Sequence, residues 1–349
     1  MSRRFPVYFL IDVSESMVGE PIQQVEEGLA NIIKELKSDP FALETVWVSI
    51  IVFAGQAKTL IPLQEIFSFY PPKFPIGSGT SLSNGLGQLM FELRKNTIKT
   101  TLEQKGDWKP IVFLFTDGVP TDETRGAIAE WQQNWQRSVN MVAVALGDQT
   151  DVGLLGQLTD NVLFFNDNKT NSYKEFFKWV TASIKTNSIA VEQNPNSFDL
   201  TELEGGSLSK IDLKKSPNSN DFIDDNYVVL AAKCQNTKRP YLMKYRKFVA
   251  QTGNGWGQTT MYKLVGAFQV DNTYFELSDE VRLKQSIHTD KLMGAPTCPC
   301  CGNQVAFALC ECGNIHCIDI QSVNTCPWCG NQGRYGVGEG GFNVDRTQG

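Results

Sequence analysis

The feature that most constrains the fold is an apolar run at residues 7–11, which ends in Asp12 and is followed by hydroxyl groups at Ser14 and Ser16. An apolar run this short is typical of a strand that is covered on both faces of a sheet. In open α/β sheets, ligands bind in the loops beyond the carboxyl ends of the strands, and these three polar side chains would lie in such a loop. An Asp-x-Ser-x-Ser loop offers only oxygen ligands, which suit a hard cation such as Mg2+ better than zinc.

The rest of the first half alternates between apolar runs and segments of helical periodicity. Pro21 stands where a helix would begin, and apolar residues at helical spacing follow it up to Leu36. This alternation continues to residue 186, and it implies a Rossmann-like α/β fold, with a mostly parallel sheet and helices on both faces. Strands are expected at 46–53, 59–63, 111–115, 139–146 and 162–165.

Composition divides the chain into three parts. Residues 1–186 form the α/β domain. Asparagine, serine, acidic residues and glycine dominate residues 187–225, which favours a linker. Residues 226–349 are expected to form a small β-rich domain that carries most of the cysteines.

Within this third part, two apolar runs flank a turn-like segment at 236–240 and predict a hairpin. Further strands are expected at 261–270 and 274–277. The glycine-rich stretch after Gly330 is expected to be loosely ordered.

Two further loops each contribute an oxygen ligand. Thr80 and Asp117 both lie in a connection that follows a predicted strand. With Asp12, Ser14 and Ser16 they make two carboxylates and three hydroxyl groups, whereas octahedral Mg2+ takes about six oxygens. One coordination position stays open, and a carboxylate of a partner protein would fill it. Mn2+ or Ca2+ would be held by the same oxygens.

The sequence offers no recognisable catalytic constellation. The chain has two histidines, His288 and His316, and neither forms a triad motif with Ser14 or Ser16. The glycine-rich turn at 77–79 lacks the Gly-Lys-Ser/Thr end of a phosphate loop. We therefore expect a binding protein and not an enzyme.

Eight of the nine cysteines lie between Cys298 and Cys329. Such density in a chain without a secretion signal favours metal over disulfides. Cys298-Pro-Cys-Cys301-Gly and Cys326-Pro-Trp-Cys329-Gly are knuckles of the form that chelates zinc, because each puts two thiolates on one tight turn. Zinc with no open ligand position would be structural.

The residues between the two knuckles leave two interpretations. In the one we prefer, the chain binds two zinc ions in a cross-braced arrangement. The first and third ligand pairs hold one ion, and the second and fourth pairs hold the other. In the other, the two knuckles alone hold one zinc ion. Adjacent His316 and Cys317 would point to opposite faces of a strand, which is the weak point of the first interpretation. The ligand pairs of that interpretation are Cys298/Cys301, Cys310/Cys312, His316/Cys317 and Cys326/Cys329, and Cys234 and Cys300 are not expected to be ligands.

Charge and hydropathy exclude some classes of partner. The net charge of −6 argues against nucleic acid as the main partner. The best basic cluster, Lys244, Arg246 and Lys247, is expected on a solvated strand face. No apolar run approaches the roughly 18 residues that a membrane helix needs, and the first strand follows Met1 too closely for a cleavable signal. We expect a cytoplasmic protein.

The stretch DVSES, the threonine of GSGTS and the aspartate of FTDG resemble the metal-ion-dependent adhesion site of von Willebrand factor A domains. The resemblance covers roughly residues 5–186 and implies ligand binding through the metal. One position departs from the commonest form of the motif, because Glu15 stands where glycine is usual. The role of Glu15 is not predicted. By this resemblance the direct ligands would be Ser14, Ser16 and Thr80, and Asp12 and Asp117 would act mostly through water or hydrogen bonds.

Nearly the whole chain, apart from residues 187–225, resembles a narrower family. LIDVSESM with GEPI, the segment QKGDWKPIVFLFTDG and the C-terminal CPCCG…CECG…HC…CPWCG are similar to TerY-type proteins of bacterial tellurite-resistance and stress systems. In that family the C-terminal part is a metal-binding domain, and the genes occur beside a Ser/Thr kinase and a PP2C-type phosphatase. The resemblance implies a non-enzymatic scaffold in phosphorylation-based stress signalling.

The alternative function is a RING-like ubiquitin ligase with a von Willebrand A substrate-binding domain. The stretch CG…HC…CPWC is superficially similar to a RING. Asn314 and Ile320, however, stand where a RING usually has ligands.

Overall fold

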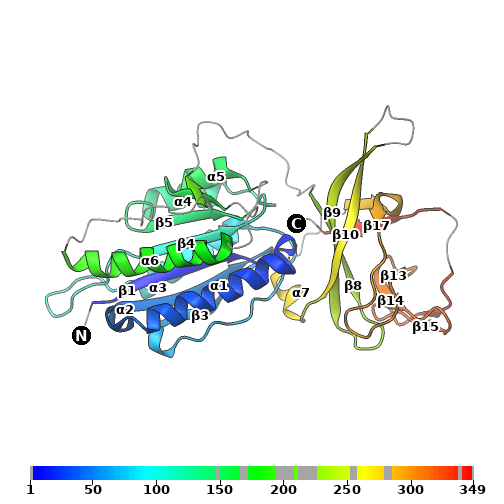
Figure 1. Cartoon of the computed structure of the whole chain (residues 1–349), viewed down its shortest axis with the longest axis horizontal. Coiled ribbons are helices and arrows are strands. Elements are labelled where there is room, and N and C mark those ends of the chain that lie inside the picture. Colours follow the sequence, from blue (N-terminus) through cyan, green and yellow to red (C-terminus); the bar gives the residue numbers. More distant parts are fainter. Residues whose placement is uncertain are drawn as a thin grey trace.

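The computed structural model of the chain consists of an α/β unit followed by a β-rich unit (Figure 1). None of the helices in the described part of the chain has the length and apolar character that a bilayer crossing requires. The structure describes residues 3–146, 150–165, 172–193, 208–210, 226–251, 258–278, 285–336 and 340–347.

The first unit is built on a seven-stranded sheet with the order β3-β2-β1-β4-β5-β6-β7. The five inner strands run parallel, and the edge strands β3 and β7 run antiparallel to their neighbours. The predicted fold class, a mostly parallel sheet, is confirmed. The strands are β1 (Phe5–Asp12), β2 (Val46–Phe53), β3 (Ala57–Glu65), β4 (Ile111–Thr116), β5 (Asn140–Ala145), β6 (Val162–Phe165) and β7 (Leu208–Lys210).

Helices cover both faces of this sheet because successive side chains of its strands point to opposite faces. Phe9 and Ile11 belong to one apolar core, and Tyr8 and Leu10 belong to the other. The first core is closed by α1 (Glu20–Lys37), α2 (Pro40–Thr45) and α6 (Ser172–Gln193). The second is closed by α3 (Leu82–Asn96), α4 (Arg125–Asn134) and α5 (Val152–Leu158).

The segment at 187–225, which composition suggested as a linker, contains described structure at two places. The helix α6 continues through Gln193, and β7 pairs with β6 at the edge of the first sheet. The other residues of this segment, up to 225, lie outside the described part of the chain.

The second unit is built on a six-stranded sheet with the order β12-β10-β9-β8-β14-β13. The predicted hairpin around 236–240 is formed by β8 and β9. Two short ribbons, β11 with β17 and β15 with β16, complete the unit. The strands are β8 (Tyr227–Lys233), β9 (Pro240–Gln251), β10 (Gln258–Gln269), β11 (Gln285–His288), β12 (Leu292–Met293), β13 (Val305–Leu309), β14 (Ile315–Ile318), β15 (Asn324–Thr325), β16 (Gln332–Gly333) and β17 (Asn343–Arg346).

Two predictions for this unit are wrong. Residues 274–277 were expected to form a strand, but they belong to the helix α7 (Thr273–Leu277). The Asp271 carboxylate accepts the Thr273 backbone N–H at 2.9 Å at the start of α7, and Tyr274 and Leu277 share a buried helix face. The stretch after Gly330 contains β16 and β17, because β17 finds a pairing partner in β11.

The two units share a continuous apolar core. Val229, Leu242 and Leu277 of the second unit belong to the same buried cluster as β1 and α1. Figure 1 shows α7 at the junction of the two units. The units are therefore packed against each other and not only tethered by the chain.

Candidate metal centres

The end of β1 lies beside the end of β4, since Ile11 is paired with Phe115 in parallel register. Asp12 therefore emerges next to Thr116. The Thr116 hydroxyl donates to Asp12 Oδ2 at 2.6 Å, and the Ser14 backbone N–H donates to Asp12 Oδ1 at 2.9 Å. These two bonds fix the carboxylate of the first predicted loop.

A chain of hydrogen bonds continues from the first loop to the third. Ser14 Oγ and Ser16 Oγ are 2.9 Å apart, and Ser16 Oγ donates to Asp117 Oδ1 at 2.7 Å. Ser14 and Ser16 are buried, whereas Asp117 is half-buried. The first and third loops thus bring their predicted oxygen ligands into direct contact.

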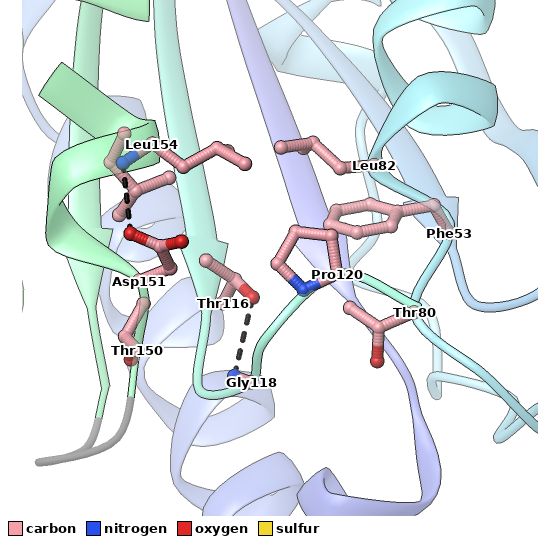
Figure 2. A pocket seen from close by; sticks show the side chains of 10 residues that line it. Phe53, Thr80, Leu82, Thr116, Gly118, Pro120, Thr150, Asp151 and Leu154 are labelled. Carbon is pink, nitrogen blue, oxygen red and sulfur yellow. Dashed lines mark hydrogen bonds between the residues drawn. The ribbon is translucent and has the colours of Figure 1, made fainter. Parts of the chain in front are cut away.

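The second loop joins this group through Thr80. A methyl group added at Gly118 would lie 3.6 Å from Thr80 Oγ1 and 3.9 Å from Ser16 Oγ, so both hydroxyls face the same glycine. The Thr80 backbone N–H donates to Thr121 Oγ1, and the Thr121 backbone N–H donates to Thr80 O, both at 2.9 Å. Figure 2 shows Thr80, Thr116 and Gly118 around this end of the sheet.

We call Asp12, Ser14, Ser16, Thr80 and Asp117 the cation loop residues. Burial raises the pKa of Asp12 to about 6, even though hydrogen bonds from Ser14 and Thr116 act to lower it. A buried carboxylate that must be ionised is stabilised by a positive charge close to it. An oxygen-only set of two carboxylates and three hydroxyls fits a hard divalent cation.

A small pocket adjoins the cation loop residues (Figure 2). Its volume is about 10 Å³, which is space for roughly one water molecule. Its lining combines Thr80, Thr116 and Gly118 with Phe53, Leu82, Pro120, Thr150, Asp151, Leu154 and Leu155.

Glu15 lies inside the motif, between Ser14 and Ser16, and its carboxylate accepts hydrogen bonds from two other segments. The Ser78 hydroxyl donates to Glu15 Oε2 at 3.3 Å, and the Tyr274 hydroxyl donates to Glu15 Oε1. The Glu15 side chain is completely buried. Its carboxylate thus faces the second unit.

The cysteines of the second unit form two clusters of four. Cluster one contains Cys234, Cys298, Cys301 and Cys317, and cluster two contains Cys310, Cys312, Cys326 and Cys329. Within each cluster the sulfur atoms all lie within 4.8 Å of one another. Neighbouring sulfurs are 3.7 to 3.9 Å apart.

These distances fit a tetrahedral metal. Zinc–sulfur bonds of about 2.3 Å place the sulfurs of a tetrahedral site about 3.8 Å apart, whereas a disulfide requires about 2.05 Å. Backbone N–H groups also point at the sulfurs, since Gln235 donates to Cys317 Sγ and Thr237 donates to Cys234 Sγ, both at 3.4 Å. Such bonds stabilise metal-bound thiolates.

Two family models match the chain. The von Willebrand factor type A domain matches residues 7–179, and the TerY-C metal binding domain matches residues 224–349. The chain joins a von Willebrand factor A domain to a TerY-C metal-binding domain. This pair of domains supports a metal-dependent role in protein interaction.

Solved structures resemble parts of the chain at low sequence identity. Proximal thread matrix protein 1 from the mussel byssus, solved with a zinc-occupied MIDAS motif, is 18% identical over 51% of this chain and 46% of its own, with a TM-score of 0.36. The ArnB paralog VWA2 from Sulfolobus acidocaldarius is 12% identical over 78% of this chain and 66% of its own, with a TM-score of 0.38. This chain spans about half the length of the mussel protein, which it matches in three structures.

The predicted set of zinc ligands in the TerY-C domain is wrong at His316. His316 was expected as a ligand, but its Nε2 lies 2.7 Å from the Tyr335 hydroxyl and its Nδ1 lies 2.9 Å from Cys317 O. Because a carbonyl only accepts, Nδ1 carries the proton and Nε2 accepts from Tyr335. Burial lowers the pKa of His316, so the ring stays neutral. Adjacent side chains of β14 point to opposite faces, which sends Cys317 to cluster one and His316 away from it.

Cys234 takes the place expected for His316. The pairing of the remaining cysteines follows the cross-braced order, and the rival arrangement, with one zinc held by both knuckles, is wrong because the knuckles belong to different clusters. Cys300 belongs to neither cluster.

A signal for Cys234 was present in the turn that follows it. In both knuckles the glycine four residues after the first cysteine donates its N–H to that cysteine's carbonyl, as Gly302 does to Cys298 at 2.9 Å. Lys238 donates to Cys234 in the same way at 3.0 Å, with a φ of 61°. The turn at Cys234 is thus a knuckle in which Thr237 replaces the second cysteine.

Other residues that the sequence did not indicate hold the cation loop in the von Willebrand domain. The Thr121 hydroxyl accepts from the Thr80 N–H, and α4 begins only at Arg125. Asp122 accepts from the Ser81 hydroxyl at 2.7 Å and from the Ser83 N–H at 3.0 Å, and so ties the second loop to the third. The signal for both is their place directly after the predicted Asp117 turn.

Lys244 also differs from the prediction. It was expected on a solvated strand face with Arg246 and Lys247, but it is only 3% exposed. Its ammonium group donates to the backbone carbonyls of Ser16 and Val18. The side chain is buried because β9 packs against the von Willebrand domain at this point.

Proposed function

We propose that the chain is a non-enzymatic scaffold that binds an acidic group of a partner protein through a divalent cation. The observation that carries the proposal is the convergence of three loops on one group of five oxygen-bearing side chains. Mg2+, Mn2+ or Ca2+ would be held by Ser14, Ser16 and Thr80, with Asp12 and Asp117 fixing those hydroxyls. The cation would act as a Lewis acid with one coordination position left open, and a carboxylate of a partner protein would fill that position.

The protein's own residues prepare this position before a cation arrives. Thr116 orients Asp12, Asp117 orients Ser16, and Thr121 fixes the backbone of Thr80. A site whose side chains are already in place loses less conformational entropy when it binds. The half-buried Asp117 marks the side from which a partner's acidic group would approach.

The TerY-C domain would act as a second docking surface, with zinc as a structural element. Each of its clusters offers four thiolates and therefore leaves a tetrahedral zinc no open position for a substrate. We propose two zinc ions per chain on this basis.

The cellular setting of the proposal comes from the family resemblance. We propose a cytoplasmic scaffold in a tellurite-resistance or stress-response system, with a Ser/Thr kinase and a PP2C-type phosphatase as partners. A RING-like ligase is the weaker candidate. The likeness to a RING rests on the cysteine run from 298 to 329, but cluster one also contains Cys234, which lies outside that run in the β8–β9 turn. Ubiquitin transfer stimulated by the purified chain would reverse this order.

The test is an affinity capture with purified, zinc-loaded protein and the purified kinase and phosphatase. The wild type and Asp12→Ala are compared in buffers with and without Mg2+, and Asp160→Asn serves as a control because Asp160 is exposed. We expect retention only by the wild type and the control, and only with Mg2+. If Asp12→Ala retains the same partners with the same Mg2+ dependence, the cation-mediated scaffold is ruled out.

A further inference from the structure

The TerY-C domain packs against the loops that carry the cation loop residues, and we call these loops together the cation loop. We infer that α7 and Lys244 of this domain set the shape, and with it the cation affinity, of the loop, so that Tyr274 and Glu15 are positioning residues for the cation. The inference rests on the proposed function, since it concerns regulation of the same site. It also gives Glu15, the departure from the usual glycine, a role.

Glu15 is the attachment point on the loop. It stands between Ser14 and Ser16 in sequence, and its carboxylate is completely buried. The hydroxyl of Tyr274, the second residue of α7, donates to one carboxylate oxygen, and the Ser78 hydroxyl donates to the other at 3.3 Å. A buried carboxylate depends strongly on such donors, because it has lost its water. The position of α7 therefore determines where Glu15, and with it the two serines, can lie.

The second loop is attached to the same helix. The Ser78 backbone N–H donates to Ser278 Oγ at 3.0 Å. The β2–β3 turn, whose Gly55 N–H donates to Ser78 O at 2.9 Å, is also attached, because the Gln56 N–H donates to Leu277 O at 2.8 Å. A methyl group added at Gly77 would lie 2.7 Å from the β-carbon of Leu277, so only glycine fits between α7 and the loop that leads to Thr80. Two of the three cation-bearing loops thus rest on α7.

Lys244 holds the remaining side of the first loop. Its ammonium group donates to the carbonyls of Ser16 and Val18 and lies 4.4 Å from the centre of the Tyr227 ring. These bonds fix the backbone on both sides of Met17 and hence the direction of the Ser16 hydroxyl. The ligands are held in place through their backbone from one side and through Glu15 from the other.

The outer side of α7 faces cluster two. Phe275 packs edge-on against Trp328, with ring centres 6.1 Å apart, and Trp328 stands between Cys326 and Cys329 in the second knuckle. The Lys233 ammonium lies 4.2 Å from the Trp328 ring and 5.5 Å from the Phe275 ring. The helix therefore lies between the second cysteine cluster and the cation loop, and a change in its docking reaches both.

Coupling of this kind is reciprocal. If docking of α7 raises the affinity of the loop for a cation, cation binding must tighten the docking of α7 by the same factor. The structure therefore predicts two linked effects: weaker cation binding when the Tyr274–Glu15 bond is removed, and slower hydrogen exchange in α7 when a cation binds.

The experiment measures Mn2+ affinity by electron paramagnetic resonance of the free ion, in zinc-loaded full-length protein. Tyr274→Phe removes only the hydroxyl that reaches Glu15. Tyr245→Phe is the matched control, because this buried tyrosine donates to Gly294 O within its own domain at 3.4 Å. We expect Tyr274→Phe to weaken Mn2+ binding about tenfold, which is the effect of one lost bond to a buried charge, and the control to change it less than about twofold.

The second arm follows hydrogen exchange of α7 in the wild type with and without Mn2+. Slower exchange upon Mn2+ addition is the expected result, and this arm needs no variant that must fold. The inference is overturned if Tyr274→Phe and the wild type bind Mn2+ with equal affinity, or if Mn2+ does not change the hydrogen exchange of α7. Either result leaves the proposed function intact. A wild type that binds no Mn2+ overturns both.

Discussion

The cation loop and the cysteine clusters bring their ligands together by different physical means. Among the cation loop residues the ligands hold one another, because Ser16 donates to Asp117 and the hydroxyls of Ser14 and Ser16 lie 2.9 Å apart. In the clusters the sulfurs are neighbours at 3.7 to 3.9 Å, and thiols are weak hydrogen-bonding groups. One site is satisfied by its own hydrogen bonds, and the other needs an ion.

The comparison separates what each domain requires in order to fold. The von Willebrand domain has two large apolar cores, one on each side of its sheet. Its cation loop lies beyond the carboxyl ends of the central strands β1 and β4. The TerY-C domain has one smaller core, and five of its residues or their packed neighbours are cysteines. The first domain should keep its fold without a cation, whereas the second should depend on its metal.

The largest expected effect is that of zinc removal. A chelator with a reductant should unfold the sheet of the TerY-C domain, since structural zinc contributes about 10 kcal/mol or more to the folding of small domains. Strands β1, β4 and β5 should remain protected from hydrogen exchange after Mg2+ is restored. Full protection of β8 and β14 in the zinc-free protein would show that the comparison is wrong.

The next effect concerns the ligand that the sequence did not predict. Cys234→Ser should reduce bound zinc from two ions per chain to one, because the serine hydroxyl is a poor substitute for a thiolate in cluster one. His316→Gln should keep two ions, since His316 bonds Tyr335 and Cys317 O instead of a metal. Elemental analysis of both purified variants decides between them. Loss of zinc only in His316→Gln would restore the predicted ligand.

A smaller effect is expected from pH at the cation loop. Burial raises the pKa of Asp12 to about 6, so protons compete with the cation below that value. The carboxylate is mostly ionised at pH 7 and mostly protonated at pH 5, and binding of a cation requires the ionised form. Affinity for Mg2+ should therefore fall about tenfold between pH 7 and pH 5, as calorimetry can measure. An affinity that does not change over this range would mean that Asp12 is not part of the site.

The smallest effect is that of a residue acting through Asp12. Thr116→Val removes the hydroxyl that donates to Asp12 Oδ2 and should weaken Mg2+ binding a few-fold, with a loss of about 1 kcal/mol in unfolding free energy. Thr159→Val is the matched control, because Thr159 donates to Met141 O at 2.6 Å in the same domain. The control should lose similar stability in a denaturant titration and keep its cation affinity. Equal affinity in both variants would remove Thr116 from the account.

The parts that sequence reasoning predicted well are those set by local rules. Asp12 and Asp117 could be placed together because the carboxyl ends of neighbouring parallel strands meet at one edge of a sheet. The cysteine knuckles could be found because each is a short run with a glycine at a fixed position. The mostly parallel sheet with helices on both faces followed from strand–helix alternation, except for its edge strand β7, which lies in the segment predicted as a linker.

The parts that could not be predicted depend on contacts between distant segments. Cys234 lies far from the other cysteines, and its turn has Lys238 and Thr237 where the other knuckles have glycine and cysteine. The sequence alone predicts Lys244 at the surface, because only the packing of β9 against the first domain buries it. The run at 274–277 is too short for its periodicity to separate a strand from a helix. The bond from Tyr274 to Glu15 exists only because the two domains are docked.

The most direct test of the account is a calorimetric Mg2+ titration of zinc-loaded wild type and of the double variant Ser14→Ala/Ser16→Ala, with zinc content measured on the same samples. The account predicts one Mg2+ per wild-type chain, no Mg2+ binding by the double variant, and two zinc ions in both. Unchanged Mg2+ affinity in the double variant, or loss of zinc along with Mg2+, would contradict the assignment of two separate metal chemistries to the two domains.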